Sequence, residues 1–495
     1  MRRLLRALLV GPLALAAACG AAGDEPLPPN LLFVSIDTLR ADAVGAYGRD
    51  WDGTKALDAL AARGVTFTSA WAHSPKTAPS HMTMFTGLPP RTHGLGNQRS
   101  SGAQSLSDKV TTLAETLQRA GFHTGAVTSG GNVKGYLGFE RGFDSFDERP
   151  SQPPQKLERM TAWIRDAATP APGEAPRPWF AFFHTYAVHD PYLPPKKYVR
   201  KYTDPDYTGD IVGDPIELAR QIRDGDDRAP WAETHAKAAE NFWMRVDVDD
   251  PADMAYLEQL YLAGVAAFDF QLGRFLDELE AEGLLENTIV VVTSDHGEEF
   301  GEHGDTRHNS VWRQHLHVPL VVVVPPGLVR DPALVTGREI DAPVRHMDLM
   351  PSLLELLGVD PEGLVDQAML GESWAPWLAD PAAEDPGRPV YGEHRSRLET
   401  PLDLWALRQG DRLLIQPRPD AVPLLLDLAT NALELRADGG LPGELGPDHP
   451  DHALLLDLQK QLLGRFQREA GEVGVGAGIE LSPEARAELE ALGYL

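Results

Sequence analysis

The sequence predicts an α/β fold, with a mostly parallel central sheet flanked by helices and a small antiparallel subdomain at the C-terminal end. Three observations support this. Apolar runs at 31–36, 179–183 and 288–293 are typical of strands buried on both faces. Segments with helical periodicity alternate with these runs, as in parallel sheets. After residue 389 the chain breaks into short strand-like runs joined by turns, which indicates hairpins.

From Asn30 onward, predicted strands and predicted helices alternate along the chain. Segment 149–178, rich in Pro and Ala around a short helix, is expected to be an insertion or loop. The polar, turn-rich segment 196–250 is expected to form loops that shape a substrate site. The C-terminal runs PVYGEH, LWALRQGDRLLIQ and AVPLLLDLATNALELRAD predict strands. The predicted strands of the main domain are 31–36, 65–69, 125–128, 179–183, 288–293 and 320–324, and the predicted helices of the chain are 55–63, 111–120, 156–167, 254–282, 347–357 and 453–468.

The N-terminus has the features of a signal peptide. Three arginines within the first six residues precede an apolar stretch that ends at Ala18. Cys19, the only cysteine, stands at the expected cleavage point, which resembles a bacterial lipoprotein signal whose thiol is lipidated. Simple cleavage and secretion is the alternative. We therefore expect a signal peptide at 1–19, a flexible tether at 20–29, a catalytic domain at 30–388 and a C-terminal subdomain at 389–495.

This N-terminus predicts an exported protein, anchored by lipid to the bacterial cell envelope or otherwise periplasmic or secreted. The formal net charge is -28 and the isoelectric point is about 4.9. Nucleic acids and anionic membrane surfaces attract basic proteins, so the charge argues against both as partners. Membrane contact is expected through the lipid anchor only. With a single cysteine, no disulfide can form within the chain.

Carboxylates follow two of the predicted buried strands. Asp37 comes directly after 31–36, and Asp295 and His296 come just after 288–293. Ligands of open α/β sheets bind at the carboxyl ends of the strands, so these side chains are expected to meet. Carboxylate oxygens with an imidazole nitrogen suit a divalent cation. The alternative is that each residue only caps a helix or forms a turn.

The stretch TAPSHMTMFTG, residues 77–87, predicts a helix that begins near a hydroxyl. Pro79 is expected at the first helical position, where its fixed φ is favourable. The Thr77 hydroxyl would then lie just ahead of the helix, and the unbonded N–H groups there attract an anion. A sulfate or phosphate ester fits this arrangement. A simple N-cap role for Thr77 is the alternative.

These stretches resemble the sulfatase branch of the alkaline phosphatase superfamily. The resemblance covers the chain from about residue 30 to its end and implies hydrolysis of an anionic ester of a small molecule, a glycan or a lipid head group. The matching stretches are NLLFVSIDTLRADAVGAYG, LDALAARGVTFTSAWA, TAPSHMTMFTGLPPRTHG, GFHTGAVTSG, GFERGFDSF, SDHGEEFGEHG, HVPLVVVVP and ELEALGYL.

The chain departs from formylglycine sulfatases at the reaction centre. Thr77 stands where they carry the Cys or Ser that is converted, and His81 stands where they carry Arg. Their paired Asp-Asp is Asp37-Thr38 here, and their Asp-Asn-Gly is Asp295-His296-Gly297. The set Asp, Thr, Asp and His found here is the ligand set of the superfamily's threonine-nucleophile phosphodiesterases and phosphoethanolamine transferases. The resemblance implies one divalent cation (Ca²⁺, Mg²⁺, Mn²⁺ or Zn²⁺) bound by Asp37, Thr77, Asp295 and His296.

Further roles follow from the resemblance. His189 matches the family's His-x-Pro, which contacts the anionic group, and His308 aligns with the residue that protonates the leaving group or binds the anion. His303 is the next candidate, and Glu298 is expected to orient His296. The expected substrate-binding residues are His81, Arg40, His189 and His308. A surface ion pair is the alternative for Arg40, and His184 is expected to be structural.

The predicted function is metal-dependent hydrolysis of sulfuric or phosphoric esters. Thr77 would attack covalently, with His308 or His189 assisting departure of the alcohol. One alternative is a phosphodiesterase or phosphoethanolamine-type transferase that uses the same Asp/Thr/Asp/His site. A second alternative is a catalytically degenerate, surface-binding lipoprotein.

Overall fold

A computed structural model describes residues 27–96, 103–214, 216–218, 239–395, 403–416, 424–428, 452–469 and 478–479. The predicted signal peptide with Cys19, and most of the predicted tether, lie outside the described residues. None of the helices in the described ranges combines the length and hydropathy that a membrane span needs.

Eight strands form the central sheet, in the order β13-β2-β12-β8-β1-β7-β5-β6. β1 lies between β7 and β8 and is parallel to both. β12 is antiparallel to β8 and β2, and the other pairs of this described sheet are parallel. This confirms the mostly parallel sheet. The strands are β1 (Asn30–Ile36), β2 (Val65–Phe67), β5 (His123–Val127), β6 (Ser145–Asp147), β7 (Trp179–Thr185), β8 (Thr288–Thr293), β12 (Leu320–Val323) and β13 (Arg338–Ile340).

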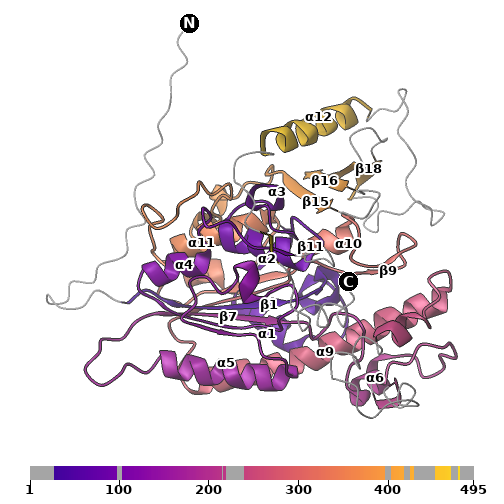
Figure 1. The fold of residues 1–495 in the computed structure, drawn as a ribbon, viewed down its shortest axis with the longest axis horizontal. Helices are drawn as coiled ribbons and strands as arrows, with labels where there is room; N and C mark the ends of the chain where they lie inside the picture. Colours follow the sequence, from indigo (N-terminus) through magenta and orange to yellow (C-terminus); the bar gives the residue numbers. More distant parts are fainter. Residues whose placement is uncertain are drawn as a thin grey trace, which may run out of the picture.

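Helices cover both faces of this sheet, as Figure 1 shows. Successive side chains of a strand point to opposite faces, so Phe33 joins one core cluster and Val34 the other. On the Phe33 side lie α2 (Thr77–Thr86), α4 (Leu113–Arg119) and α11 (Leu349–Leu356). On the Val34 side lie α1 (Lys55–Arg63), α5 (Pro153–Ala167) and α9 (Pro251–Ala281). The predicted helices of this domain are present, with ends shifted by up to three residues.

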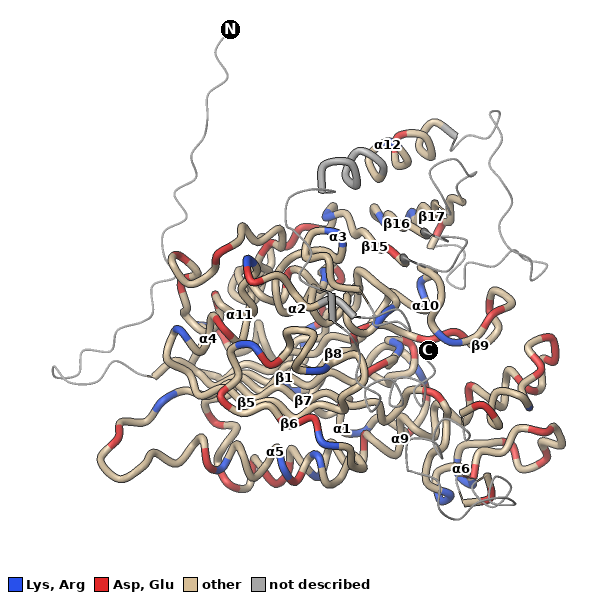
Figure 2. Tube along the Cα trace, in the orientation of Figure 1, with Lys and Arg blue, Asp and Glu red and all other residues tan. Residues whose placement is uncertain are grey.

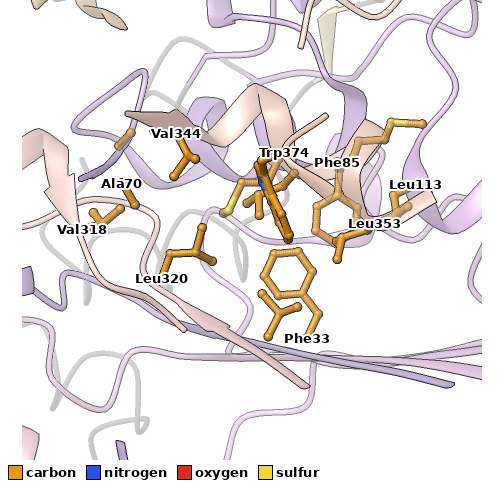
Figure 3. Close-up of a cluster of buried hydrophobic side chains, with 14 of the residues drawn as sticks. Phe33, Ala70, Phe85, Leu113, Val318, Leu320, Val344, Leu353 and Trp374 are labelled. Atoms are coloured by element: carbon orange, nitrogen blue, oxygen red, sulfur yellow. The ribbon is translucent and has the colours of Figure 1, made fainter. Parts of the chain in front are cut away.

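The apolar cluster on the Phe33 side fixes α2 against the sheet (Figure 3). The Phe33 and Phe85 rings stack with centroids 6.2 Å apart, and Trp374 lies 4.8 Å from Phe67. Burial of one such side chain stabilises a fold by about 2 kcal/mol. Because every residue of α2 is buried, its N-terminus is held firmly at the sheet edge.

A separate four-stranded antiparallel sheet follows, in the order β15-β16-β17-β18, at the top of Figure 1. Its strands are β15 (Val390–Arg395), β16 (Asp403–Gln409), β17 (Arg412–Gln416) and β18 (Leu424–Asp427). Helix α12 (His452–Glu469) packs on it through Leu455, Leu458 and Leu462. The predicted C-terminal sheet is therefore confirmed, whereas the expected strand at ALELRAD falls outside the described residues.

Short elements complete the description. They are β3 (Ala70–Trp71), α3 (Pro90–His93), β4 (Ala103–Gln104), α6 (Lys196–Tyr202), β9 (Glu299–Phe300), β10 (Thr306–Arg307), α10 (Arg313–Leu316), β11 (His317–Val318), β14 (Val344–Arg345) and β19 (Gly478–Ile479). Figure 2 shows acidic residues along the outer helices, including α5 and α9, which matches the negative net charge.

Candidate active site

The site is built at the carboxyl edge of the two central strands, β1 and β8. Asp37 follows β1, and Asp295 and His296 follow β8 after Ser294. One ligand atom from each of these three residues lies within 4.8 Å of the others, and all three residues are fully buried. The parallel pairing of β1 with β8 thus brings together residues far apart in the sequence.

Within the described residues, only histidines lie within ion-pair distance of the two carboxylates. Burial, and the nearby charges of Asp295 and Glu298, raise the pKa of Asp37 well above its usual value. Asp37 Oδ1, Asp295 Oδ2 and His296 Nε2 are buried and have no hydrogen-bond partner among the described residues. Buried polar atoms are nearly always paired, so this set of donors fits a divalent cation.

His296 has the tautomer that a metal ligand requires. Its Nδ1 lies 3.0 Å from the Gly297 carbonyl oxygen, which makes Nδ1 the protonated nitrogen. Nε2 therefore keeps its lone pair and lies 3.3 Å from Asp295 Oδ2. Burial lowers the pKa of His296 to about 4, so the ring is neutral at neutral pH.

Thr77 lies at the start of α2, beside the first carboxylate. Lys76 is the N-cap, so Thr77 is the first helical residue and Pro79 the third. The expected first position for Pro79 is therefore wrong, although its missing N–H still falls among the unbonded groups of the first turn. The Thr77 hydroxyl faces Asp37 closely enough to lower the pKa of that carboxyl, against the larger effect of burial.

His81, in α2, directs its ring toward β1 and the Asp295 carboxylate. Its Nε2 is 2.9 Å from Ser35 Oγ, and its Nδ1 is 2.9 Å from the Thr77 carbonyl oxygen and 3.4 Å from Asp295 Oδ2. The ring is fully buried. These contacts position Asp295 and the first turn of α2; the expected substrate contact of His81 remains a prediction.

The two histidines predicted to assist catalysis lie beside His296. The His308 ring is 4.6 Å from that of His296 and 5.2 Å from that of His189. His189 Nδ1 lies 3.0 Å from Asp190 Oδ1. Burial lowers the pKa of His189, but the charge and hydrogen bonds of Asp190, together with the Glu298 charge, outweigh burial, so the net shift of this pKa is upward.

Glu298 binds a different histidine from the one expected. Its Oε1 lies 3.1 Å from His308 Nδ1, whereas His296 Nδ1 is taken by a backbone carbonyl. Glu298 therefore orients His308. Burial and the Asp190 charge raise the pKa of Glu298 to about 8.

Arg40 and His303 are not brought into this cluster. The Arg40 guanidinium donates to Asp42 at 2.8 and 2.6 Å and to Glu302 at 2.5 Å, which matches the ion-pair alternative, although the side chain is buried. His303 Nδ1 lies 2.8 Å from Glu299 Oε1, and its ring stacks on Trp312 at 4.1 Å.

Three residues of the site were not predicted to serve it. His184, expected to be structural, places Nε2 3.2 Å from Asp37 Oδ2 and so orients that carboxylate. Thr38 has a strained φ of 59° and donates its N–H to Asp295 Oδ1 at 3.3 Å. Lys76 donates to Asn309 Oδ1 at 2.8 Å. Its position next to Thr77 is the one sequence signal that could have revealed it.

Lys76 adds positive charge to the same site. Burial lowers the pKa of its ammonium to about 8, even though the charges of Glu298 and Asp190 act in the opposite direction. Its charge in turn lowers the pKa values of His308 and His296, after the larger effect of burial. A local cation favours an anionic substrate on an otherwise acidic protein.

Comparison with known proteins identifies the class of enzyme. The Sulfatase family profile matches residues 29–359. A "Sulfatase" of Formosa agariphila is 28% identical over 373 residues, which is 67% of this chain and 69% of the relative. An "N-acetylglucosamine-6-O-sulfatase" of Bacteroides thetaiotaomicron is 24% identical over 421 residues, 71% of this chain and 72% of the relative. The solved phosphonate monoester hydrolase of Agrobacterium radiobacter has a TM-score of 0.65 at 22% identity and covers 89% of this chain and 96% of its own.

The chain belongs to the sulfatase family. It is an enzyme of the sulfuric ester hydrolase class, and its Asp/Asp/His cluster is a candidate site for the divalent cation that this family generally binds.

Proposed function

We propose that the protein is a metal-dependent hydrolase of sulfuric or phosphoric esters that uses Thr77 as its nucleophile. The observation that supports this most is the placement of the Thr77 hydroxyl beside Asp37, within a cluster that Asp295 and His296 complete. The sulfatase relatives favour sulfate as the group transferred, and the sugar sulfatase among them favours a sulfated glycan as substrate.

Asp37, Asp295, His296 and Thr77 would hold the cation. When bound, a divalent cation supplies positive charge that favours ionised oxygen and stabilises the transition state. The N–H groups of the first turn of α2 add partial positive charge at the same place. Lys76 would bind a nonbridging oxygen of the ester. These groups orient the ester for attack by Thr77 Oγ1 opposite the leaving alcohol.

The chemistry then balances in two steps. In the first, the Thr77 hydroxyl would release its proton to solvent, a bond forms between Thr77 Oγ1 and the sulfur or phosphorus, the bond to the alcohol oxygen breaks, and His308 donates a proton to that oxygen. Glu298, in contact with His308 Nδ1, would replace the proton on His308. In the second, water attacks the same sulfur or phosphorus atom and gives one proton through His308 back to Glu298. The bond to Thr77 breaks, and the Thr77 oxygen takes a proton from solvent, which restores its hydroxyl. His189 would contact the anionic group throughout.

A phosphodiesterase or phosphoethanolamine-type transferase is the second candidate. The observation that favours it is the threonine and histidine at positions 77 and 296, in place of the residues of formylglycine sulfatases. A degenerate binding lipoprotein would keep this geometry without turnover. Export and lipidation at Cys19 remain part of the proposal, and the mass of the mature N-terminus tests them.

The test is hydrolysis of a panel of 4-nitrophenyl sulfate, 4-nitrophenyl phosphate and bis(4-nitrophenyl) phosphate by the metal-loaded protein. We expect turnover of at least one ester and a loss of about 10⁴-fold in kcat in Thr77→Ala, since the nucleophile is removed. Thr77→Ser keeps a hydroxyl and should retain more activity than Thr77→Ala. Thr169→Ala, on the surface beside Arg165, is the matched control and should match the wild type.

Preference for the sulfate ester would support the first candidate, and preference for the diester would support the second. Turnover that survives Thr77→Ala would contradict the mechanism. No turnover of any ester by the metal-loaded wild type would favour the degenerate protein.

A further inference from the structure

Arg307, next to His308, has a strained backbone. Its φ is 68°, in the left-handed region that glycine favours and that other residues rarely adopt. Such strain persists where the surrounding structure imposes it, and it is concentrated at functional sites. Arg307 ends β10, in the loop that also carries His308 and Asn309. The backbone at this position therefore holds a long, charged side chain in a conformation that it would not adopt unaided.

The Arg307 side chain rests on an aromatic ring and forms an ion pair with Asp190. The guanidinium carbon lies 4.2 Å from the centroid of Trp243, and Nε lies 3.7 Å from Asp190 Oδ2. Trp243 is itself fixed, because its Nε1 donates to the same Asp190 oxygen at 2.7 Å. The side chain is 34% exposed and donates no hydrogen bond within the part of the chain that the structure describes. A guanidinium held in this way is preorganised to bind an oxyanion.

This guanidinium lies next to the candidate active site. Arg307 directly precedes His308, and its partner Asp190 lies 3.0 Å from His189 Nδ1, whose ring is 5.2 Å from that of His308. Asp190, its closest acidic neighbour, is shared with His189 and Trp243. In the proposed function, the cleaved ester group binds at the cation site, the α2 N-terminus and Lys76. Arg307 is a further positive charge, not needed for that group, on a chain whose net charge is -28.

We propose that Arg307 determines substrate specificity by binding a second anionic group, carried by the alcohol portion of the ester. The inference rests on the proposed function only for the location of the cleaved group at Thr77. The substrates expected from it are esters whose alcohol bears a carboxylate, sulfate or phosphate. Trp243 and Asp190 act as positioning residues, because they touch the guanidinium and fix its plane.

The test compares ligands that cannot be hydrolysed, with the full, metal-loaded protein. Benzenesulfonate is paired with 4-sulfobenzoate, and phenylphosphonate with 4-phosphonobenzoate, so that each pair differs by one carboxylate. Calorimetric titration should give a Kd about tenfold lower for the carboxylated member of at least one pair, the size of one charge-assisted contact at a partly exposed site. In Arg307→Gln the preference should disappear, and in Arg307→Lys part of it should remain.

Arg307→Gly separates binding from folding. Glycine tolerates the φ of 68°, so this variant should lose the preference without a lower unfolding temperature. Arg165→Gln is the control, since Arg165 pairs with Glu278 and Glu282 on the exposed side of α9 and should leave the preference unchanged. Equal affinity for both members of each pair in the wild type, or a preference that survives Arg307→Gln, would overturn the proposal. Preference without any ester turnover would uphold it and refute the proposed hydrolysis instead.

Discussion

Two buried acidic clusters of the described structure are completed in opposite ways. Asp348, the N-cap residue of α11, accepts hydrogen bonds from Arg345 Nε at 2.9 Å, from a second Arg345 nitrogen at 2.8 Å and from the Glu372 N–H at 2.8 Å. Arg388 adds a further contact at 3.4 Å. Every charge of this cluster is balanced by the chain itself.

The pair of Asp37 and Asp295 has no lysine or arginine partner among the described residues. Its neighbours His81, His184 and His296 are buried histidines whose pKa values are lowered by burial, so they bring little positive charge. The first cluster therefore stabilises the fold. The second is held together by the fold, and its charge calls for a cation that the chain itself does not supply. Like charges buried side by side are costly unless a cation joins them.

The largest expected effect is on activity at the uncompleted cluster. Asp295→Asn should lower turnover by about 10³-fold or more, since it removes a ligand charge at the reaction centre. It should not lower the free energy of unfolding measured in chelator, because the amide still accepts from the Thr38 and His296 N–H groups and the repulsion with Asp37 is removed. Kinetics with added metal and denaturant unfolding with EDTA check both parts. Strong destabilisation of Asp295→Asn in EDTA would show that this cluster, like that of Asp348, stabilises the fold without a cation.

Asp348→Asn should have the opposite outcome. Removal of one partner leaves Arg345 and Arg388 buried with less compensation, which costs about 3–5 kcal/mol of unfolding free energy. Urea unfolding of this variant beside Asp295→Asn measures the contrast. Surviving folded protein should retain ester turnover, because Asp348 contacts no residue of the proposed ligand set in the described structure. If Asp348→Asn unfolds like the wild type, the cluster does not stabilise the fold as argued.

The ligand cluster could be predicted from the sequence, but several of the residues around it could not. The apolar runs before Asp37 and Asp295 predict buried parallel strands, and parallel strands share one carboxyl edge, so the ligand cluster could be predicted. His184 could not, because its role depends on the register that pairs it with Ser35 beside Asp37. Arg40 lies one residue before the short 3₁₀ turn Ala41–Ala43, and only the fold shows that Asp42 and Glu302 take its donors.

The smallest effect concerns His317, a half-buried histidine that hydrogen-bonds to the chain itself, as Asp348 does. His317 Nε2 lies 2.8 Å from the Thr68 carbonyl oxygen, and its ring stacks on Trp71. Burial, with a contribution from the Arg313 charge, lowers the pKa of His317 to about 4. The unfolded chain therefore binds more protons between about pH 6.5 and 4, and stability falls as pH falls through that window.

We expect His317 to account for a loss of about 2 kcal/mol on acidification from pH 7 to 4, allowing for its partial exposure. His317→Gln should remove this pH-dependent contribution to stability. The difference in unfolding free energy between the wild type and the variant should therefore become smaller as the pH falls from 7 to 4, measured by urea unfolding at matched salt. A constant difference from pH 7 to 4 would show that His317 titrates alike in both states.

One divalent cation is expected to join Asp37, Thr77, Asp295 and His296. A crystal structure of the full protein grown with excess metal, with anomalous scattering to locate the ion, tests it most directly. We expect one ion per chain at this cluster, with oxygen and nitrogen ligands at about 2.0–2.6 Å. A structure at saturating metal with no ion there, or with the ion bound by other residues, would contradict it.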